Sequence, residues 1–106
     1  MATNDDFSLL RLRKKLGLAQ SEMARRMGLS LRPYQELESD NKIRKVRSRH
    51  VRLAESVALD VALEKEDPEL APVSIRNRAM KLARVILAQN IRHKALKLAD
   101  IILDQE

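Results

Sequence analysis

The chain contains no cysteine and little of several residue types that interrupt or diversify a fold. Its 106 residues include two glycines, three prolines and two aromatic side chains, Phe7 and Tyr34. Without cysteine there is no disulfide and no thiolate metal site. With so few helix breakers an all-α fold is favoured, in which Leu, Ile, Val, Ala and Met fill one modest core. We therefore expect one small helical domain with an appendage.

The sequence also lacks a signal peptide and any apolar run that approaches a membrane span, so we expect a cytoplasmic protein with no membrane partner. Its net charge of +6 indicates an anionic partner. Residues 1–52 hold 13 Lys/Arg against six Asp/Glu, residues 53–75 hold one against six, and residues 76–106 hold seven against three. The positive charge therefore lies in two segments that an acidic stretch separates.

The stretch from Gln20 to Glu38 predicts two short helices joined by a tight turn. An apolar face at helical spacing marks the first helix, formed by Met23, Ala24 and Met27. Gly28 offers the positive φ that ends a helix, and the hydroxyl of Ser30 can cap the next one, so the turn is about three residues long. In the second helix, Tyr34 and Leu37 lie on one apolar face. Its other face points away from the core and carries Leu31, Arg32, Gln35, Glu36 and Ser39.

A first helix is predicted before this stretch, with Asp5 or Asp6 as its cap and Gly17 at its end. Its buried stripe is formed by Leu9, Leu12 and Leu16. Arg13 lies close to that stripe, where an unmatched guanidinium would cost several kcal/mol. The residue therefore needs an acidic partner elsewhere in the fold.

The run from Leu12 to Ser30, followed by Tyr34, Leu37 and Glu38, resembles the helix-turn-helix of the phage repressor and Cro-like family, also called the Xre family. The resemblance covers roughly residues 9–60. It depends on several residues that stand at the family's spacings together: Gly17, Leu18, Gln20, Ala24, Gly28, Ser30, Leu37 and Glu38. It implies a lambda-repressor-like helix-turn-helix domain with a C-terminal helical extension, and double-stranded DNA as the partner.

The resemblance implies that four residues of the second helix touch base edges: Leu31, Arg32, Gln35 and Glu36. Arginine can bond bidentately to guanine, glutamine can pair with adenine and an aliphatic side chain can pack on a thymine methyl group, so Arg32 is the strongest candidate for specificity. Glu36 fits less well, because a carboxylate repels phosphate unless it accepts from cytosine or holds a neighbouring arginine. Tyr34 matches an apolar core position of the family, so we expect burial rather than base contact.

The resemblance also implies contacts to the DNA backbone, made by Gln20, Ser30, Asn41, Lys42, Arg44 and Lys45. Gln20 starts a helix, where its side chain and the free backbone N–H groups can face a phosphate. The last four lie in a basic loop, which would more commonly be a solvated surface, but its position beside the helix-turn-helix favours phosphate contact. The family pairs an arginine at the position of Arg13 with a glutamate at the position of Glu38, which implies a structural ion pair.

The segment from Ser48 to about Lys65 departs from the family, which usually has two short helices here. It contains no glycine or proline, so one longer helix is expected. Its apolar stripe is formed by Val51, Ala54, Val57, Ala58, Val61 and Ala62. Asp67 and Pro68 end it. We therefore predict a DNA-binding domain at 1–67, a linker at 68–73 and a C-terminal dimerisation element at 74–106.

An internal repeat follows the linker, since residues 76–87 return as residues 92–103, sixteen positions later. In one straight helix this offset rotates the second copy by about 160°, so the two apolar stripes would face nearly opposite sides. Either the chain breaks near Gln89 and Asn90 into a helical hairpin, or a continuous helix offers each face to a different surface. A single amphipathic helix with one buried stripe is excluded on this offset. Both options leave apolar surface exposed, so we predict a homodimer.

We expect a sequence-specific duplex-DNA-binding transcriptional regulator, a repressor that binds a pseudo-palindromic operator as a homodimer. The alternative is an antitoxin or phage-type accessory protein whose C-terminal helices bind a protein partner, with DNA binding for autoregulation. RNA binding is disfavoured because aromatic stacking residues are missing. No catalytic constellation or cofactor motif is present, and His50 and His93 have no accompanying carboxylate cluster, so we expect neither an enzyme nor a metal site.

Overall fold

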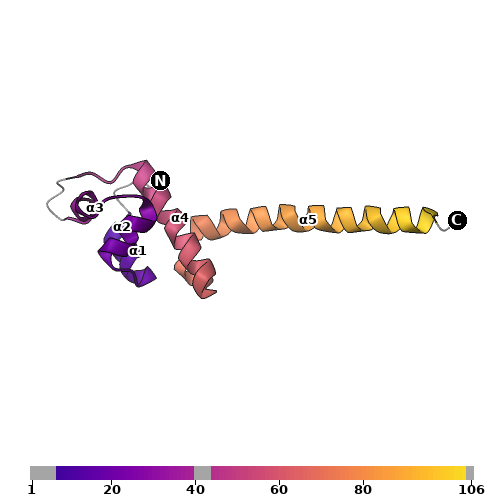
Figure 1. Cartoon of the computed structure of the whole chain (residues 1–106), viewed down its shortest axis with the longest axis horizontal. Coiled ribbons are helices and arrows are strands. Elements are labelled where there is room, and N and C mark those ends of the chain that lie inside the picture. The colour runs from indigo at the N-terminus through magenta and orange to yellow at the C-terminus, as the bar shows by residue number, and fades with distance from the viewer. Residues whose placement is uncertain (1–6, 40–43, 105–106) are drawn as a thin grey trace. The chain divides into compact units, whose positions relative to one another are not determined.

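The computed structural model describes residues 7–39 and 44–104, and the chain divides into two compact units, Met1–Pro72 and Val73–Glu106. Within the described residues the fold is all-α, as predicted, with five α-helices and a short 3-10 helix (Figure 1). In chain order these are α1 (Leu9–Leu16), α2 (Gln20–Met27), α3 (Leu31–Glu38), α4 (Ser48–Lys65), η2 (Pro68–Leu70) and α5 (Val73–Asp104). Across this described part, no helix combines the length and the apolar character needed to cross a membrane.

The core of the first unit lies between α1, α2, α3 and α4: α3 contacts α1 and α2, both of these helices contact α4, and η2 packs on α4. Its buried side chains are Leu9, Leu12 and Leu16 from α1, Met23, Ala24 and Met27 from α2, Tyr34 and Leu37 from α3, and Ala54, Val57, Ala58 and Val61 from α4. Each helix thus buries the apolar face that its spacing predicts. Val51 is only partly buried, because the stripe of α4 turns away from the core at its first turn.

Two glycines end the short helices α1 and α2. Gly17 and Gly28 have φ of 74° and 76°, and their N–H groups donate to carbonyls of the preceding turn. Nothing lies within 4 Å of a Cβ built on Gly28, so backbone conformation alone calls for glycine there. The start of α1 differs from the prediction. The helix begins at Leu9 with Ser8 as its cap, whose hydroxyl accepts from the Arg11 N–H at 3.2 Å, whereas Asp5 and Asp6 lie outside the described residues.

Helix α4 is one continuous helix of 18 residues, as its lack of glycine and proline predicts. Polar contacts join it to the neighbouring helices at its C-terminal end. The Lys65 ammonium donates to the Leu16 carbonyl at 3.0 Å, and Arg26 donates to both carboxylate oxygens of Glu64 at 2.9 and 3.1 Å. These bonds join the ends of α1 and α2 to the same turn of α4.

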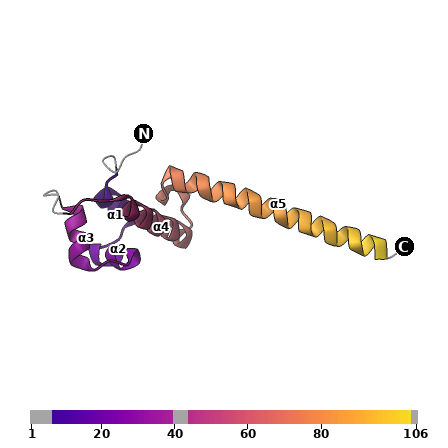
Figure 2. The same ribbon diagram turned by 90° about the horizontal axis from the view of Figure 1, so that it is seen from above.

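The second unit is a single helix, α5, which runs unbroken for 32 residues (Figure 2). Of the two alternatives left by the sixteen-residue repeat, the continuous helix is the one that forms and the hairpin does not. Gln89 and Asn90 are both helical. Neither residue removes a backbone N–H or favours positive φ strongly enough to break a helix.

Candidate functional site

Helices α2 and α3 are joined by three residues, Gly28, Leu29 and Ser30. The Leu29 N–H donates to the Ala24 carbonyl at 2.8 Å, which closes the end of α2, and Leu29 packs against the core. Ser30 occupies the cap position of α3 as predicted, but its hydroxyl makes no capping hydrogen bond. Ser30 is an exposed residue, and its hydroxyl does not contribute to the start of α3.

Helix α3 separates its side chains into a buried and an exposed face. Tyr34 is fully buried and Leu37 is 6% exposed, whereas Leu31, at 42%, is exposed together with Arg32 and Gln35. An aliphatic, a cationic and an amide side chain therefore stand together on the outer face of an eight-residue helix. The burial of Tyr34 removes its ring from any stacking role.

The structure brings Arg13 and Glu38 together beneath that face. Arg13 donates from Nε and Nη2 to the two carboxylate oxygens of Glu38, at 2.7 and 3.0 Å, and from Nη1 to the Leu18 carbonyl at 3.0 Å. The side chains are 14% and 4% exposed respectively. The paired fork geometry is the strong form of an arginine–carboxylate contact, and the Leu18 carbonyl takes a third donor of the guanidinium. This pair fixes the end of α3 to α1.

Two more side chains complete the environment of Glu38. Tyr34 donates its hydroxyl to Oε2, and Gln20 donates Nε2 to Oε1 at 3.0 Å. Burial disfavours the charged carboxylate, but the bonds from Arg13, Tyr34 and Gln20 outweigh it and hold the pKa of Glu38 below its ordinary value. Burial and the bond to Glu38 raise the pKa of Tyr34 far above that of a free phenol. At neutral pH the group is thus a neutral phenol on an ionised, fully bonded carboxylate.

Gln20 links this buried group to the exposed face. Its Oε1 accepts from Gln35 Nε2 at 3.2 Å while its own Nε2 donates to Glu38. The amide of Gln35 is therefore oriented through Gln20 by the ion pair, and the second hydrogen on each amide nitrogen remains available. Sequence reasoning assigned Gln20 and Gln35 to separate roles and missed this contact, because the two residues lie on different helices.

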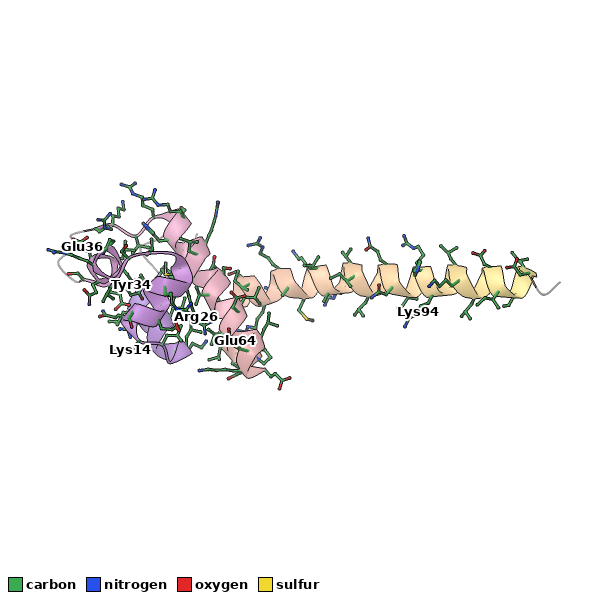
Figure 3. The ribbon with its side chains drawn as sticks, viewed as in Figure 1. Lys14, Arg26, Tyr34, Glu36, Glu64 and Lys94 are labelled. Atoms are coloured by element: carbon green, nitrogen blue, oxygen red, sulfur yellow. The ribbon has the colours of Figure 1, made fainter. Side chains whose placement is uncertain are left out.

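Glu36, labelled in Figure 3, forms an ion pair with Arg44, and the two side chains are 25% and 49% exposed respectively. Arg44 donates from Nε and Nη2 to Glu36 Oε1, at 3.3 and 3.1 Å. Of the two arrangements that would make a carboxylate acceptable at this position, this is the one in which it holds a neighbouring arginine. Lys45 is exposed beside Arg44, whereas Asn41 and Lys42 lie outside the described residues.

The basic segment continues into α4 and is anchored there by His50. The exposed basic side chains after Glu38, within the described residues up to the middle of α4, are Arg44, Lys45, Arg47, Arg49 and Arg52. His50 is 5% exposed and its Nδ1 accepts from the Arg47 N–H at 2.9 Å, which satisfies a free donor at the start of α4. Burial, and then the charges of Arg49, Arg44 and Arg47, lower the pKa of His50.

Sequence reasoning considered His50 only in arguing against a metal site and missed its part in starting the helix. The usual residues at that position are glutamate and glutamine, so no sequence signal marked it. Among residues 7–39 and 44–104 no three His, Cys, Asp or Glu side chains gather in a way that could hold a metal ion.

Comparison of the chain with protein-family models, with curated proteins and with solved structures finds no match.

Proposed function

We propose that the chain is a sequence-specific duplex-DNA-binding transcriptional regulator, a repressor that binds a pseudo-palindromic operator as a homodimer. In this proposal α2 and α3 form a helix-turn-helix of the phage repressor and Cro-like type, with α3 as the recognition helix. The observation that carries it is the outer face of α3, where Leu31, Arg32 and Gln35 are exposed on a helix that the Arg13–Glu38 pair holds from behind.

The chemistry of this face suits base edges in the major groove. A helix about 10–12 Å across fits a groove about 12 Å wide. Arg32 presents a fork of donors suited to guanine, Gln35 presents an amide suited to adenine, and Leu31 presents an apolar surface suited to a thymine methyl group. Because Gln20 already orients Gln35, that amide loses little conformational freedom on binding. Glu36 then acts through Arg44 rather than on a base.

The basic segment supplies the contacts to the phosphate backbone. Arg44 and Lys45 follow the recognition helix directly, and Arg47, Arg49 and Arg52 continue the same run of exposed positive charge. Gln20 and Ser30 stand at the starts of α2 and α3, where free N–H groups favour an anion. Asn41 and Lys42 keep their proposed phosphate role from the resemblance alone. Each neutralised phosphate adds roughly one unit to the slope of log affinity against log salt concentration.

The alternative is a protein that uses its C-terminal helix to bind a protein partner, in the manner of an antitoxin or phage-type accessory protein, with DNA binding for autoregulation. The exposed apolar side chains of α5 favour some protein contact there. They do not favour a foreign partner over a second copy of the chain, so the homodimer is the simpler proposal.

The test is selection of bound sequences from a randomised duplex library with the full chain, followed by fluorescence-anisotropy titration of the selected duplex and a scrambled one at several salt concentrations. We expect the selected duplex to bind about a thousandfold more tightly. Arg32→Ala should lose most of that ratio, because one bidentate base contact is worth about 1–3 kcal/mol. Lys45→Ala should weaken both duplexes alike and reduce the salt slope.

Lys14→Ala is the matched control for Lys45→Ala, because Lys14 is an exposed lysine on α1 that lies well apart from Glu36 (Figure 3). It should leave both affinities nearly unchanged. Enrichment of no sequence, together with equal and wholly salt-driven binding to both duplexes, would contradict the proposal. So would an Arg32→Ala protein that keeps the full preference.

A further inference from the structure

Helix α5 leaves apolar side chains exposed along its length. Every residue from 77 to 104 is exposed, and the large apolar ones keep 47–68% of their surface accessible. Side chains of α5 stand out from both edges of its ribbon (Figure 3). An isolated helix is marginally stable in water, and monomeric proteins rarely leave this much contiguous apolar surface uncovered. A further polypeptide surface is needed to cover it.

One apolar stripe runs along α5, formed by Met80, Leu87, Ile91, Leu98 and Ile102, and Arg84 and Lys94 lie at its edges. Their spacing of seven, four, seven and four residues is an eleven-residue repeat, and at about 100° per residue all five lie within about 60° of one another. Ala83 and Ala95 flank the stripe. As the sixteen-residue offset predicts, α5 is not apolar on one side alone, because Leu82, Val85, Leu96 and Leu103 are exposed on the opposite face. The opposite face is interrupted by Gln89, His93 and Asp100.

We propose that this stripe is the homodimer interface, and that α5 of a second copy packs along it antiparallel, with the two-fold axis beside Ile91. This inference builds on the homodimer of the proposed function and names the surface that makes it. In this arrangement Met80 faces Ile102 of the second copy, and Leu87 faces its Ala95. Such a contact is isologous, because the same residues serve both copies and no apolar end is left over.

The charge along α5 favours the antiparallel orientation. Residues 76–92 carry five Lys/Arg and no Asp/Glu, whereas residues 93–104 carry two Lys/Arg and two Asp. A parallel pair would place two strongly basic halves side by side, with Arg84 beside Arg84 and Lys94 beside Lys94 of the second copy. An antiparallel pair places each basic half beside a neutral half, so the like-charge repulsion is largely avoided.

Side-chain size favours the same orientation. Antiparallel packing about Ile91 sets the large Leu87 against the small Ala95 of the second copy, and Leu98 against the aliphatic part of its Arg84. Large and small residues on facing positions interdigitate, which closes the space between two helices without voids. A parallel pair in register would set leucine against leucine and alanine against alanine, so wide and narrow layers would alternate.

The stripe is large enough to hold a dimer. Five large side chains on each helix, with roughly 100 Å² of exposed apolar surface apiece, give about 1,000 Å² in all, the size at which a specific interface forms. Helix α4 is the other candidate surface. It leaves two large apolar side chains exposed, Leu53 and Leu63, with Ser56 and Asp60 between them in the chain. The interface therefore belongs to α5.

Sedimentation equilibrium of the full chain without DNA, over about a hundredfold range of concentration, tests the interface. The wild-type chain should be a dimer. Ile91→Asp places two carboxylates against each other at the two-fold axis and should raise the dissociation constant at least about a hundredfold. Leu96→Asp is the matched control, because Leu96 lies on the opposite face of the same helix with 61% exposure against 68% for Ile91. It should leave the dimer intact.

A wild-type chain that stays monomeric overturns the proposal, as does a dimer that survives Ile91→Asp or that Leu96→Asp disrupts equally. Because no DNA is present, these outcomes are independent of whether α3 binds an operator. A monomer that still binds half of a palindromic site would leave the DNA-binding proposal standing and remove this one.

Cysteine cross-linking tests the orientation, since the chain has no cysteine of its own. Leu87→Cys and Ala95→Cys chains, one of them tagged, are mixed and oxidised. Antiparallel packing predicts disulfides between the two variants and few within either one, because residue 87 meets residue 95 of the second copy. Cross-links within each pure variant, and none between them, would show a parallel pair and overturn the orientation.

Discussion

Removing the Arg13 guanidinium measures how much the buried ion pair contributes to the stability of the first unit. In Arg13→Met a side chain of similar length keeps the packing beside α1, while Glu38 loses its two strongest donors. The carboxylate is 4% exposed, so water cannot replace them fully. Stranding one partner of a buried pair costs about 3–5 kcal/mol. That cost is most of the free energy of unfolding expected of a unit this small, because whole domains have free energies of unfolding of about 5–15 kcal/mol.

The assay can be confined to the first unit. Tyr34 is the single tyrosine and the chain has no tryptophan, so tyrosine fluorescence reports on α3 alone, whereas far-ultraviolet circular dichroism also detects α5. In urea the midpoint for Arg13→Met should fall by about 1.5–5 M, given a slope of about 1–2 kcal/mol per molar. Arg13→Lys should lose less, because an ammonium can still approach one carboxylate oxygen but not both.

Arg25→Met is the matched control, since Arg25 also pairs with a glutamate, Glu22, but on the surface, with its side chain 71% exposed. An exposed pair contributes about 0–1 kcal/mol, so this variant should unfold almost as the wild type does. If Arg13→Met lost no more stability than Arg25→Met, the inference that the buried pair holds α3 against α1 would be refuted.

Two further predictions concern the ends of α4. Glu66 is the only residue other than glycine with positive φ in the described part of the chain, at 53°. Glu66→Gly should gain about 0.5–1 kcal/mol and a few degrees in melting temperature, while Glu66→Ala gains nothing. Because the pKa of His50 is lowered by burial and nearby arginines, the unfolded chain binds its proton more tightly. The contribution of His50 to stability should therefore be full above about pH 6.5 and decline below it. In calorimetry between about pH 5.5 and 7.5, His50→Gln should reduce this decline and His93→Gln should leave it unchanged. Equal slopes in both histidine variants, or a less stable Glu66→Gly, would contradict these accounts.

The helix ends of the first unit were predictable because local chemistry sets them. Gly17 and Gly28 end helices through positive φ, and the lack of glycine and proline from Ser48 to Lys65 leaves α4 uninterrupted. Apolar spacing likewise predicted which face of each helix is buried. The start of α1 was not predictable in the same way, because several residues near it are suitable caps.

Contacts across helices could not be derived from spacing. The bonds from Gln35 to Gln20 and from Arg44 to Glu36 depend on how α2, α3 and the basic segment meet in space. The Arg13–Glu38 pair was expected only because of a family resemblance, since the two residues are 25 positions apart. For α5, a repeat of sixteen residues and a stripe of eleven coexist in one sequence. Which of them matters depends on whether the helix is broken, and the unbroken helix that forms agrees with the absence of glycine and proline at Gln89 and Asn90.

The two faces of α3 also differ in how freely they can diverge. Tyr34, Leu37 and Glu38 are tied to the core and the ion pair, so most exchanges there would cost the fold. Arg32 touches none of that network and is exposed, so a lineage or an engineer can replace it with little loss of stability. Gln35 is intermediate, because exchanging it releases Gln20 as well. New binding preferences should therefore arise first at Arg32, and changes at Gln35 should tend to come with a second change at Gln20.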